Sequence, residues 1–242
     1  MNHVLKILFL VLINFICTQS RANEHVLDLL NEKSVEVLTR YIKEDVEVSF
    51  IGGKSLIPIE FSDIPKTTSR EVSAAYKENE VKSDMIYKNK IIFLSETVYG
   101  INAGVFDSMY ITLSDSFSSP QARFRESERQ YVSELKRNQK IKIICTGAGM
   151  TLGSVMFSEC FSMNRVLSIA ERKIFSELKS QLKNKRIDTW VAGLVAFSDP
   201  KASKVKKEDN QKYFSDYKKS LIDDGFEIID SNEKIFIDIN KI

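Results

Sequence analysis

Apolar residues recur at helical spacing near the start of the chain and change to strand-like patterns further on. They fall at Val26, Leu29, Leu30, Val35, Val37, Leu38, Tyr41 and Ile42, which predicts an amphipathic helix with one covered face. The next stretch, VEVSFIGGKSLIPIEF, predicts two short strands around a Gly52-Gly53 turn. SDIPKTTS then has the composition of a linker. We therefore expect an N-terminal helix plus hairpin over 23–66.

The middle of the chain combines one helical pattern with several strand patterns. Ser69 is a candidate N-cap for a leading helix over 69–87. Two strands should follow, separated by a GINAG turn, and then a third strand, a helix and two last strands. This order is that of an α+β fold, a five-stranded OB-fold β-barrel, placed at 67–161. The segments that predict these elements are Ile91–Tyr99, Ser108–Leu113, QARFR, SERQYVSELKR, KIKIICTG and SVMFSECF.

The C-terminal third, 162–242, carries weaker signals. A long charged helix with an Ile/Leu stripe comes first, and IDTWVAGLVAF is apolar enough for a strand or a buried helix. A lysine-rich polar loop, a helix ending at Gly225 and a terminal hairpin over EIIDSNEKIFIDI should follow. We expect both flanking α/β segments to pack against the barrel rather than to form a large domain of their own.

The first 22 residues have the pattern of a secretory signal peptide. Lys6 precedes the apolar run ILFLVLINFIC, and SRA, which ends at Ala22, fits the small-x-small cleavage rule. The apolar run is shorter than the roughly 20 residues that a spanning helix needs. A retained anchor and lipid attachment at Cys17 are alternatives, although Ile16 is bulky for a lipid-attachment motif. The pattern predicts export to the periplasm or beyond the cell, without a stable membrane span after cleavage.

Charge and cysteine content follow from that cleavage. The chain has 35 basic residues, and losing Lys6 and Arg21 would leave 33 against 33 acidic residues. A formally neutral chain has no overall field to attract a polyanion. Cys145 and Cys160 would then be the remaining cysteines, which predicts one disulfide in an exported protein. Two buried free thiols are the alternative. A register in which paired residue numbers sum to 305 would set the two cysteines opposite each other.

The helix ahead of the first predicted strand carries a recognisable set of side chains. At fixed spacing stand Tyr76, Asn79, Glu80, Asp84, Tyr87 and Lys90, followed later by YITL and ICTGAGMTLGSVMFSEC. Residues 74–161 thereby resemble a family of small exported bacterial OB-fold proteins and lipoproteins described as tRNA-anticodon-binding-like. Two positions depart from that family, because Glu96 and Asn138 stand where it usually has glycine. We interpret the helix side chains as structural, through local hydrogen bonding, and expect Glu96 to point outward.

The sequence favours binding over catalysis. It contains no G-x-S-x-G, H-E-x-x-H or calcium-loop motif, and His25 is the one histidine after residue 22. We therefore expect no enzyme activity, no metal and no cofactor. The favoured function is an exported OB-fold binding or interaction module whose partner is an envelope protein, a peptide or a glycan.

Single-stranded nucleic acid is the alternative ligand, since OB-folds stack bases on aromatic side chains in basic grooves. Residues 90–161 carry eight basic and seven acidic residues, a balance that makes nucleic acid the less favoured partner. The candidate binding-face aromatics are Tyr99, Phe106, Tyr110 and Phe124.

Overall fold

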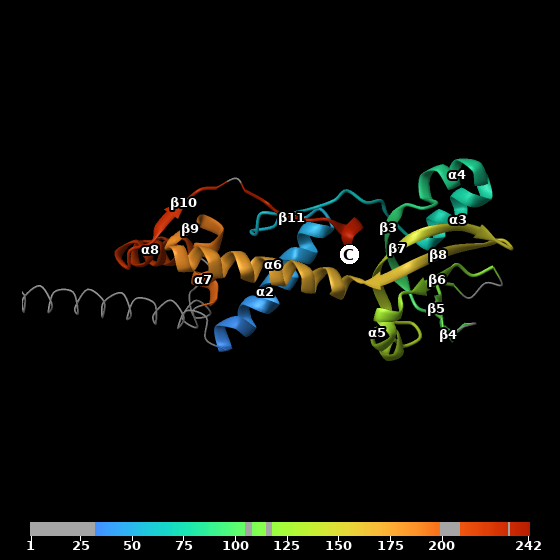
Figure 1. The fold of residues 1–242 in the computed structure, drawn as a ribbon, viewed down its shortest axis with the longest axis horizontal. Coiled ribbons are helices and arrows are strands. Elements are labelled where there is room, and N and C mark those ends of the chain that lie inside the picture. Colours follow the sequence, from blue (N-terminus) through green and yellow to red (C-terminus); the bar gives the residue numbers. More distant parts are fainter. Residues whose placement is uncertain (1–31, 105–107, 115–117, 199–208, 232) are drawn as a thin grey trace, which may run out of the picture. The chain divides into compact units, whose positions relative to one another are not determined.

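The computed structural model describes residues 32–104, 108–114, 118–198, 209–231 and 233–242, which form two compact units. The helical unit combines the described residues up to Glu60 with Ser168–Ile237, and the sheet unit combines Phe61–Leu167 with Asp238–Ile242 (Figure 1). The expectation that the flanking segments form no large domain of their own is wrong. Segments from the two ends of the chain build a unit of their own.

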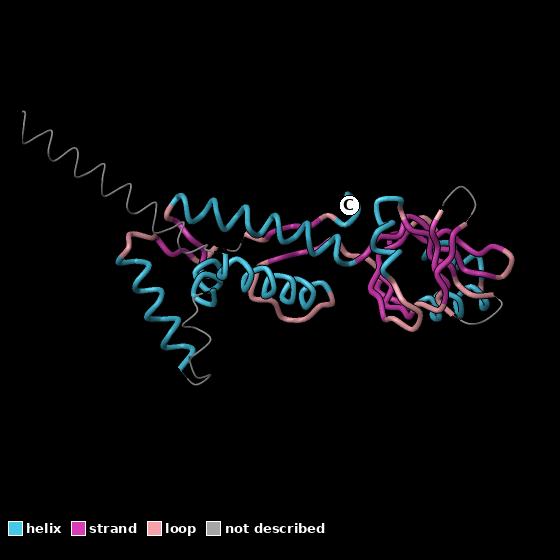
Figure 2. The backbone as a smooth tube through the Cα atoms, turned by 90° about the horizontal axis from the view of Figure 1, so that it is seen from below, coloured by secondary structure: helices cyan, strands magenta, loops and turns pink. Residues whose placement is uncertain are grey.

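Helices make up most of the helical unit (Figure 2). They are α2 (Glu32–Phe50), α7 (Thr189–Ser198), α8 (Asn210–Asp223) and the part of α6 (Met163–Asn184) from Ser168 onward. Leu38, Ile42, Val46 and Phe50 recur every four residues along α2 and are all buried. This single apolar stripe explains why α2 runs on to Phe50. The predicted hairpin around Gly52-Gly53 is wrong because Val46 and Phe50, assigned to its first strand, continue the helical stripe.

The short strands of the helical unit pair across long stretches of sequence. β9 (Arg186–Asp188) lies parallel to β10 (Glu227–Ile229), and β11 (Ile235–Ile237) pairs with β1 (Ile59–Phe61). The predicted terminal hairpin is therefore also wrong. β10 and β11 each pair with a different strand. The alternation of apolar and polar residues in this segment therefore predicted the strands but not the strands they pair with.

A seven-stranded mixed sheet dominates the sheet unit, in the order β2-β3-β7-β8-β6-β5-β4. β6 and β8 run parallel, while β3–β7, β7–β8, β6–β5 and β5–β4 are antiparallel. Residues 98 and 99 alone separate β3 from β4, which stand near opposite ends of this order. The strands are β2 (Lys66–Thr67), β3 (Ile91–Thr97), β4 (Gly100–Ala103), β5 (Met109–Thr112), β6 (Gln121–Phe124), β7 (Lys140–Thr151) and β8 (Ser154–Ser162).

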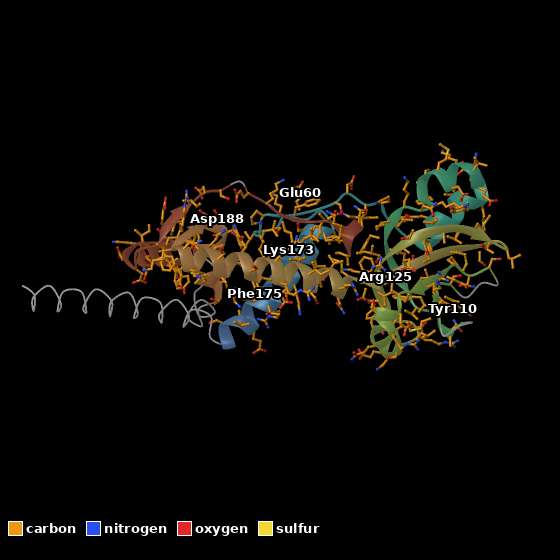
Figure 3. The ribbon with its side chains drawn as sticks, in the orientation of Figure 1. Glu60, Tyr110, Arg125, Lys173, Phe175 and Asp188 are labelled. Atoms are coloured by element: carbon orange, nitrogen blue, oxygen red, sulfur yellow. A yellow bond between two sulfur atoms is a disulfide. The ribbon has the colours of Figure 1, made fainter. Side chains whose placement is uncertain are left out.

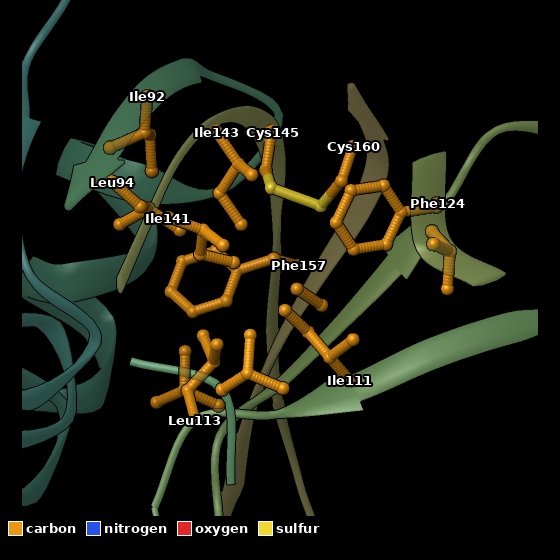
Figure 4. Close-up of a cluster of buried hydrophobic side chains, with 14 of the residues drawn as sticks. Ile92, Leu94, Ile111, Leu113, Phe124, Ile141, Ile143, Cys145, Phe157 and Cys160 are labelled. Carbon is orange, nitrogen blue, oxygen red and sulfur yellow. A yellow bond between two sulfur atoms is a disulfide. The ribbon is translucent and has the colours of Figure 1, made fainter. Parts of the chain in front are cut away.

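The core of the sheet unit lies between its strands and the first of the leading helices. Side chains from β3, β5, β7 and β8 meet there (Figure 4). Val72 and Tyr76 of α3 belong to the same core. The core includes the disulfide between Cys145 and Cys160, whose Cα atoms are 4.1 Å apart. The other labelled members in Figure 4 are Ile92, Leu94, Ile111, Leu113, Phe124, Ile141, Ile143 and Phe157.

The β7–β8 hairpin turns at Leu152-Gly153, and both residues have positive φ, as a type I′ two-residue turn requires. The register in which paired numbers sum to 305 holds at Thr151–Ser154 and again at Ile144–Phe161. Between them the pairing shifts by one residue, as at Thr146–Ser158. The expected register therefore holds at both ends of the hairpin and is interrupted in the middle.

Two predicted elements of the sheet unit differ from the structure. The leading helix is two helices, α3 (Ser69–Glu78) and α4 (Glu80–Tyr87), separated at Asn79. The GINAG segment is the strand β4 rather than a turn, because its residues pair with β5 from Gly100–Thr112 to Ala103–Met109. Short helices complete the unit, namely η2 (Glu126–Glu128), α5 (Arg129–Glu134) and η5 (Ile239–Lys241).

Candidate ligand-binding groove

A groove of about 950 Å³ lies in the sheet unit beside α3. The N-terminal end of α3, which is well capped, forms part of its wall. Thr68 is the N-cap of α3, and its hydroxyl accepts a hydrogen bond from the Glu71 N–H at 3.2 Å. The Glu71 carboxylate in turn accepts from the Thr68 N–H at 2.9 Å. This capping box satisfies two of the free N–H groups of the helix end. It fixes the turn from which Arg70, Ser73 and Lys77 line the groove.

Glu96 of β3 joins the sheet to this helix end. Its carboxylate accepts a hydrogen bond from the main-chain N–H of Ser69, which is the first residue of α3. The helix dipole favours a negative charge at this end of the helix. Burial raises the pKa of the Glu96 carboxyl, and the hydrogen bonds from Ser69 partly oppose that effect. Glu96 lies on the strand face of Ile92 and Leu94, which belong to the core. The expectation that it points outward is wrong.

The remaining groove residues come from strand ends and loops. Tyr99 follows β3 and is 40% exposed, and Lys140 begins β7. The groove also carries seven Ser and Thr side chains, one of which, Ser73, has a buried hydroxyl without a hydrogen-bond partner among the described residues. The seven are Thr68, Ser69, Ser73, Ser95, Thr97, Ser114 and Ser118.

The charge of the groove is positive. Arg70, Lys77 and Lys140 line it, and none of them forms an ion pair with a described residue. Glu96 is the acidic side chain among the described lining residues. Because cations and hydroxyl groups both hydrogen-bond to anionic oxygen atoms, the groove is suited to a ligand that carries carboxylate or phosphate groups.

The candidate aromatic residues do not form one surface. Tyr99 lines the groove, whereas Tyr110, labelled in Figure 3, lies half-buried on β5. Tyr110 pairs with the exposed Arg123 of β6. Phe124 is buried in the core, with its ring 6.1 Å from that of Tyr131. Phe106 lies outside the described residues. Tyr99 is thus the one of the three described candidates that meets the groove.

The leading-helix side chains are held by local contacts. Asn79 ends α3 and also caps α4, since its side-chain oxygen accepts from the Lys82 N–H at 2.9 Å. The Tyr76 hydroxyl donates to Asp84 at 2.9 Å, and Lys88 donates to the other oxygen of the same carboxylate at 2.8 Å. These bonds from Lys88 and Tyr76 lower the pKa of Asp84. The rings of Tyr76 and Tyr87 lie 6.4 Å apart.

Two further members of this set contribute differently. Glu80 is exposed in the first turn of α4, where a negative charge favours the helix end. Lys90 is also exposed, and its main-chain oxygen accepts from the Gly147 N–H at 2.9 Å. Gly147 has no room for a side chain, because a Cβ atom there would lie 2.2 Å from the main-chain carbonyl oxygen of Tyr87. The join between α4 and β3 is thereby fixed against β7.

Comparison with known proteins places the chain in a family. The model of the tRNA_anti-like family matches residues 1–161, well over half of the chain. The chain belongs to this family. The match extends the resemblance carried by residues 74–161 to the N-terminal segment. No curated protein matches the chain.

Two solved structures are similar to parts of the chain. One is a lipoprotein from Klebsiella pneumoniae whose description as nucleic acid-binding is provisional, with 12% identity and a TM-score of 0.35. The similarity covers 41% of this chain and 91% of that one. The other is yeast Stn1 and Ten1, with 15% identity and a TM-score of 0.27, covering 49% of this chain and 74% of that one.

The sequence reasoning missed the groove and identified Tyr99 alone among its residues. Arg70, Lys77 and Lys140 come from two distant segments, and nothing in either segment predicts that they share a surface. The division of the leading helix did have a signal, because Asn79 followed by Glu80 is a typical helix start. Among the described residues no group of His, Cys, Asp and Glu could hold a metal ion, and no helix could span a membrane.

Proposed function

We propose that the sheet unit is a five-stranded OB barrel in which β3 and β4 are two halves of one bent first strand. The pairings support this proposal: β3 binds β7, β4 binds β5, and β6 runs parallel to β8. With β3–β4 counted as strand one, the neighbours follow the order one, two, three, five, four and back to one. The short join at Val98 and Tyr99 would then place the bend at the groove.

On this barrel, the chain acts as a binding module rather than as an enzyme. The observation that carries the proposal is the groove beside α3, where three cations without partners among the described residues meet seven hydroxyl side chains. A site with this chemistry favours an extended ligand rich in carboxylate groups, which an acidic peptide or an acidic glycan would supply. Cys145 and Cys160 form a disulfide, so neither of these two provides a thiol nucleophile.

Single-stranded nucleic acid is the second candidate, and two observations favour it. Tyr99 offers an exposed ring beside the cations of the groove, and Tyr110 lies opposite Arg123 on the neighbouring strand. Aromatic and basic side chains together bind bases and phosphates. The groove itself has one such ring among its described residues, which makes a carboxylate polymer the better fit.

Fluorescence anisotropy with three labelled probes tests the proposal. The probes are an oligoglutamate peptide, an oligogalacturonate and an oligo-dT, each titrated with the purified chain at low and moderate salt. We expect binding of one carboxylate polymer, weakened about twofold to fivefold by each of Arg70→Gln, Lys77→Gln and Lys140→Gln, the range typical of exposed charge contacts. Lys82→Gln is the matched control, since Lys82 is exposed outside the groove.

The outcomes separate the candidates. Peptide and glycan are distinguished by which carboxylate probe binds. Tighter binding of oligo-dT than of both would select the nucleic-acid alternative. If Lys82→Gln weakens binding as much as the groove variants do, the groove is not the site.

Export is the remaining part of the proposal. The signal-peptide pattern of residues 1–22 supports it, and so does the disulfide, since such bonds persist in oxidising compartments. We expect the chain recovered from a cell-envelope fraction to begin at Asn23. Peptide mapping that finds residues 1–22 intact in the main pool would contradict cleavage and favour a retained anchor.

A further inference from the structure

An apolar pocket of about 510 Å³ lies in the helical unit, among α2, α7 and α8. Its walls are aromatic and aliphatic side chains, with Tyr41 and Phe197 stacked at 5.8 Å between ring centroids. Its volume is in the range of about 300–1,000 Å³ that is typical of small-molecule sites. The other apolar lining residues are Leu56, Ile57, Pro58, Trp190, Leu194 and Phe214.

Part of the pocket wall is left open by a glycine within a helix. Apart from the chain neighbours and backbone of its own helix, a Cβ atom built on Gly193 of α7 would meet no atom closer than Phe214 Cε2, at 3.9 Å. Glycine in a helix interior costs about 0.5–1 kcal/mol relative to alanine. The main chain does not require glycine here, because Gly193 is not among the residues with positive φ. The missing side chain therefore leaves room in the pocket.

Three polar residues that line the pocket are neighbours, namely Thr189, Asp230 and Ser231. Asp230 is the charged residue among the described lining residues, and its carboxylate accepts a hydrogen bond from the Thr189 hydroxyl. Lys218 stands over the Phe214 ring at 5.4 Å but does not line the pocket. A molecule bound in the pocket would therefore meet the negative charge of Asp230 rather than the positive charge of Lys218.

Trp190 has a fixed orientation beside the pocket. Its indole N–H donates to the buried Asp188 at 3.2 Å, and the Gln181 amide N–H donates to the same carboxylate oxygen at 2.8 Å. Asp188 is labelled in Figure 3. With its N–H already bonded, the ring presents an apolar face to the pocket. Trp190 is also the single tryptophan of the sequence, so its fluorescence reports on this place alone.

We propose that this pocket binds a single-chain amphiphile with a cationic, hydrogen-bond-donating head group, such as a long-chain ammonium compound. The apolar tail fills the aromatic walls, where its removal from water supplies most of the affinity. The ammonium group contacts the Asp230 carboxylate at the rim. This site is separate from the proposed groove and does not depend on it.

Trp190 fluorescence tests the proposal with three probes that differ in the head group: decylamine, decanol and decanoate, each below its micellar concentration. We expect saturable changes with affinity decreasing in that order. Asp230→Asn should weaken decylamine binding about twofold to fivefold, the range of an exposed charge contact, and leave decanol binding unchanged. Gly193→Leu should weaken binding of all three probes by occupying part of the pocket.

Controls keep the result interpretable. Ile222→Ser removes an exposed apolar side chain of α8 that does not line the pocket, so all three probes should bind it as they bind the parent. If Gly193→Leu does not fold, Phe197→Ser removes a partly exposed part of the wall instead and should weaken binding of every probe. The proposal would be overturned by the absence of a saturable response in the parent or by tighter binding of decanoate than of decylamine. Unchanged binding in Gly193→Leu, or in Phe197→Ser where that variant is used instead, would also overturn it.

Discussion

At the scale of single residues, Asn79 determines that the leading segment is two helices. It closes α3 through its N–H and starts α4 through its side chain. Asn79→Ala should lower the free energy of unfolding by about 1 kcal/mol, the usual cost of losing an N-cap. Asn79→Asp retains the acceptor and should remain close to the parent in urea unfolding. Equal stability of the alanine variant and the parent would show that the cap contributes nothing.

Glu96 should make stability depend on pH in an unusual direction. Its pKa is raised in the folded state, so the folded chain holds this proton more tightly than the unfolded chain does. The free energy of unfolding therefore receives a contribution that falls as the pH rises above the ordinary pKa of glutamate and through the raised value. This sign is opposite to that of Asp84, whose lowered pKa contributes stability that is lost as the pH falls.

Comparing Glu96→Gln with the parent isolates this contribution. The amide oxygen of glutamine can still accept from the Ser69 N–H, but it does not titrate. We expect the variant to gain stability relative to the parent as the pH rises from acid to neutral, in denaturant unfolding measured at a series of pH values. A stability difference that stays constant across this range would mean that the Glu96 pKa is not shifted.

At the scale of elements, the β7–β8 hairpin is the best supported prediction from sequence. The disulfide bridges a sequence separation of 15 residues inside the sheet-unit core. Replacing both cysteines with alanine should cost about 3 kcal/mol in the chain-entropy model, while ligand binding in the groove is retained. Thermal unfolding and probe anisotropy of the same variant measure the two effects. Loss of binding in a variant that still folds at the assay temperature would connect the bridge to function.

Elements were predictable where the signal is local. The Leu152-Gly153 turn, the strands around it and α6 follow from turn chemistry and periodicity in their own segments. The errors have a common cause, which is that the deciding partner lies elsewhere in the chain. β4 contains glycine and asparagine and is a strand because β5 pairs with it, and β10 and β11 bind β9 and β1 rather than each other.

At the scale of the whole molecule, the sequence predicted the α+β class and the family but not the two units. The helical unit draws α2 from one end of the chain and α6 to α8 from the other. Hydrophobic periodicity identifies a buried face without saying what covers it, so neither end of the chain indicates that it packs with the other. The groove was missed for the same reason, since α3, β3 and β7 meet there only in the folded unit.

The central claim is that the groove beside α3 holds the ligand. Amide hydrogen exchange with and without the carboxylate probe that binds in anisotropy tests it most directly. We expect slower exchange in the amides of 69–77, around Tyr99 and at the start of β7, with no change in β5 and β6 around Tyr110 and Arg123. Protection of the Tyr110–Arg123 face, with the groove segments unchanged, would contradict the account and place the ligand on the opposite set of strands.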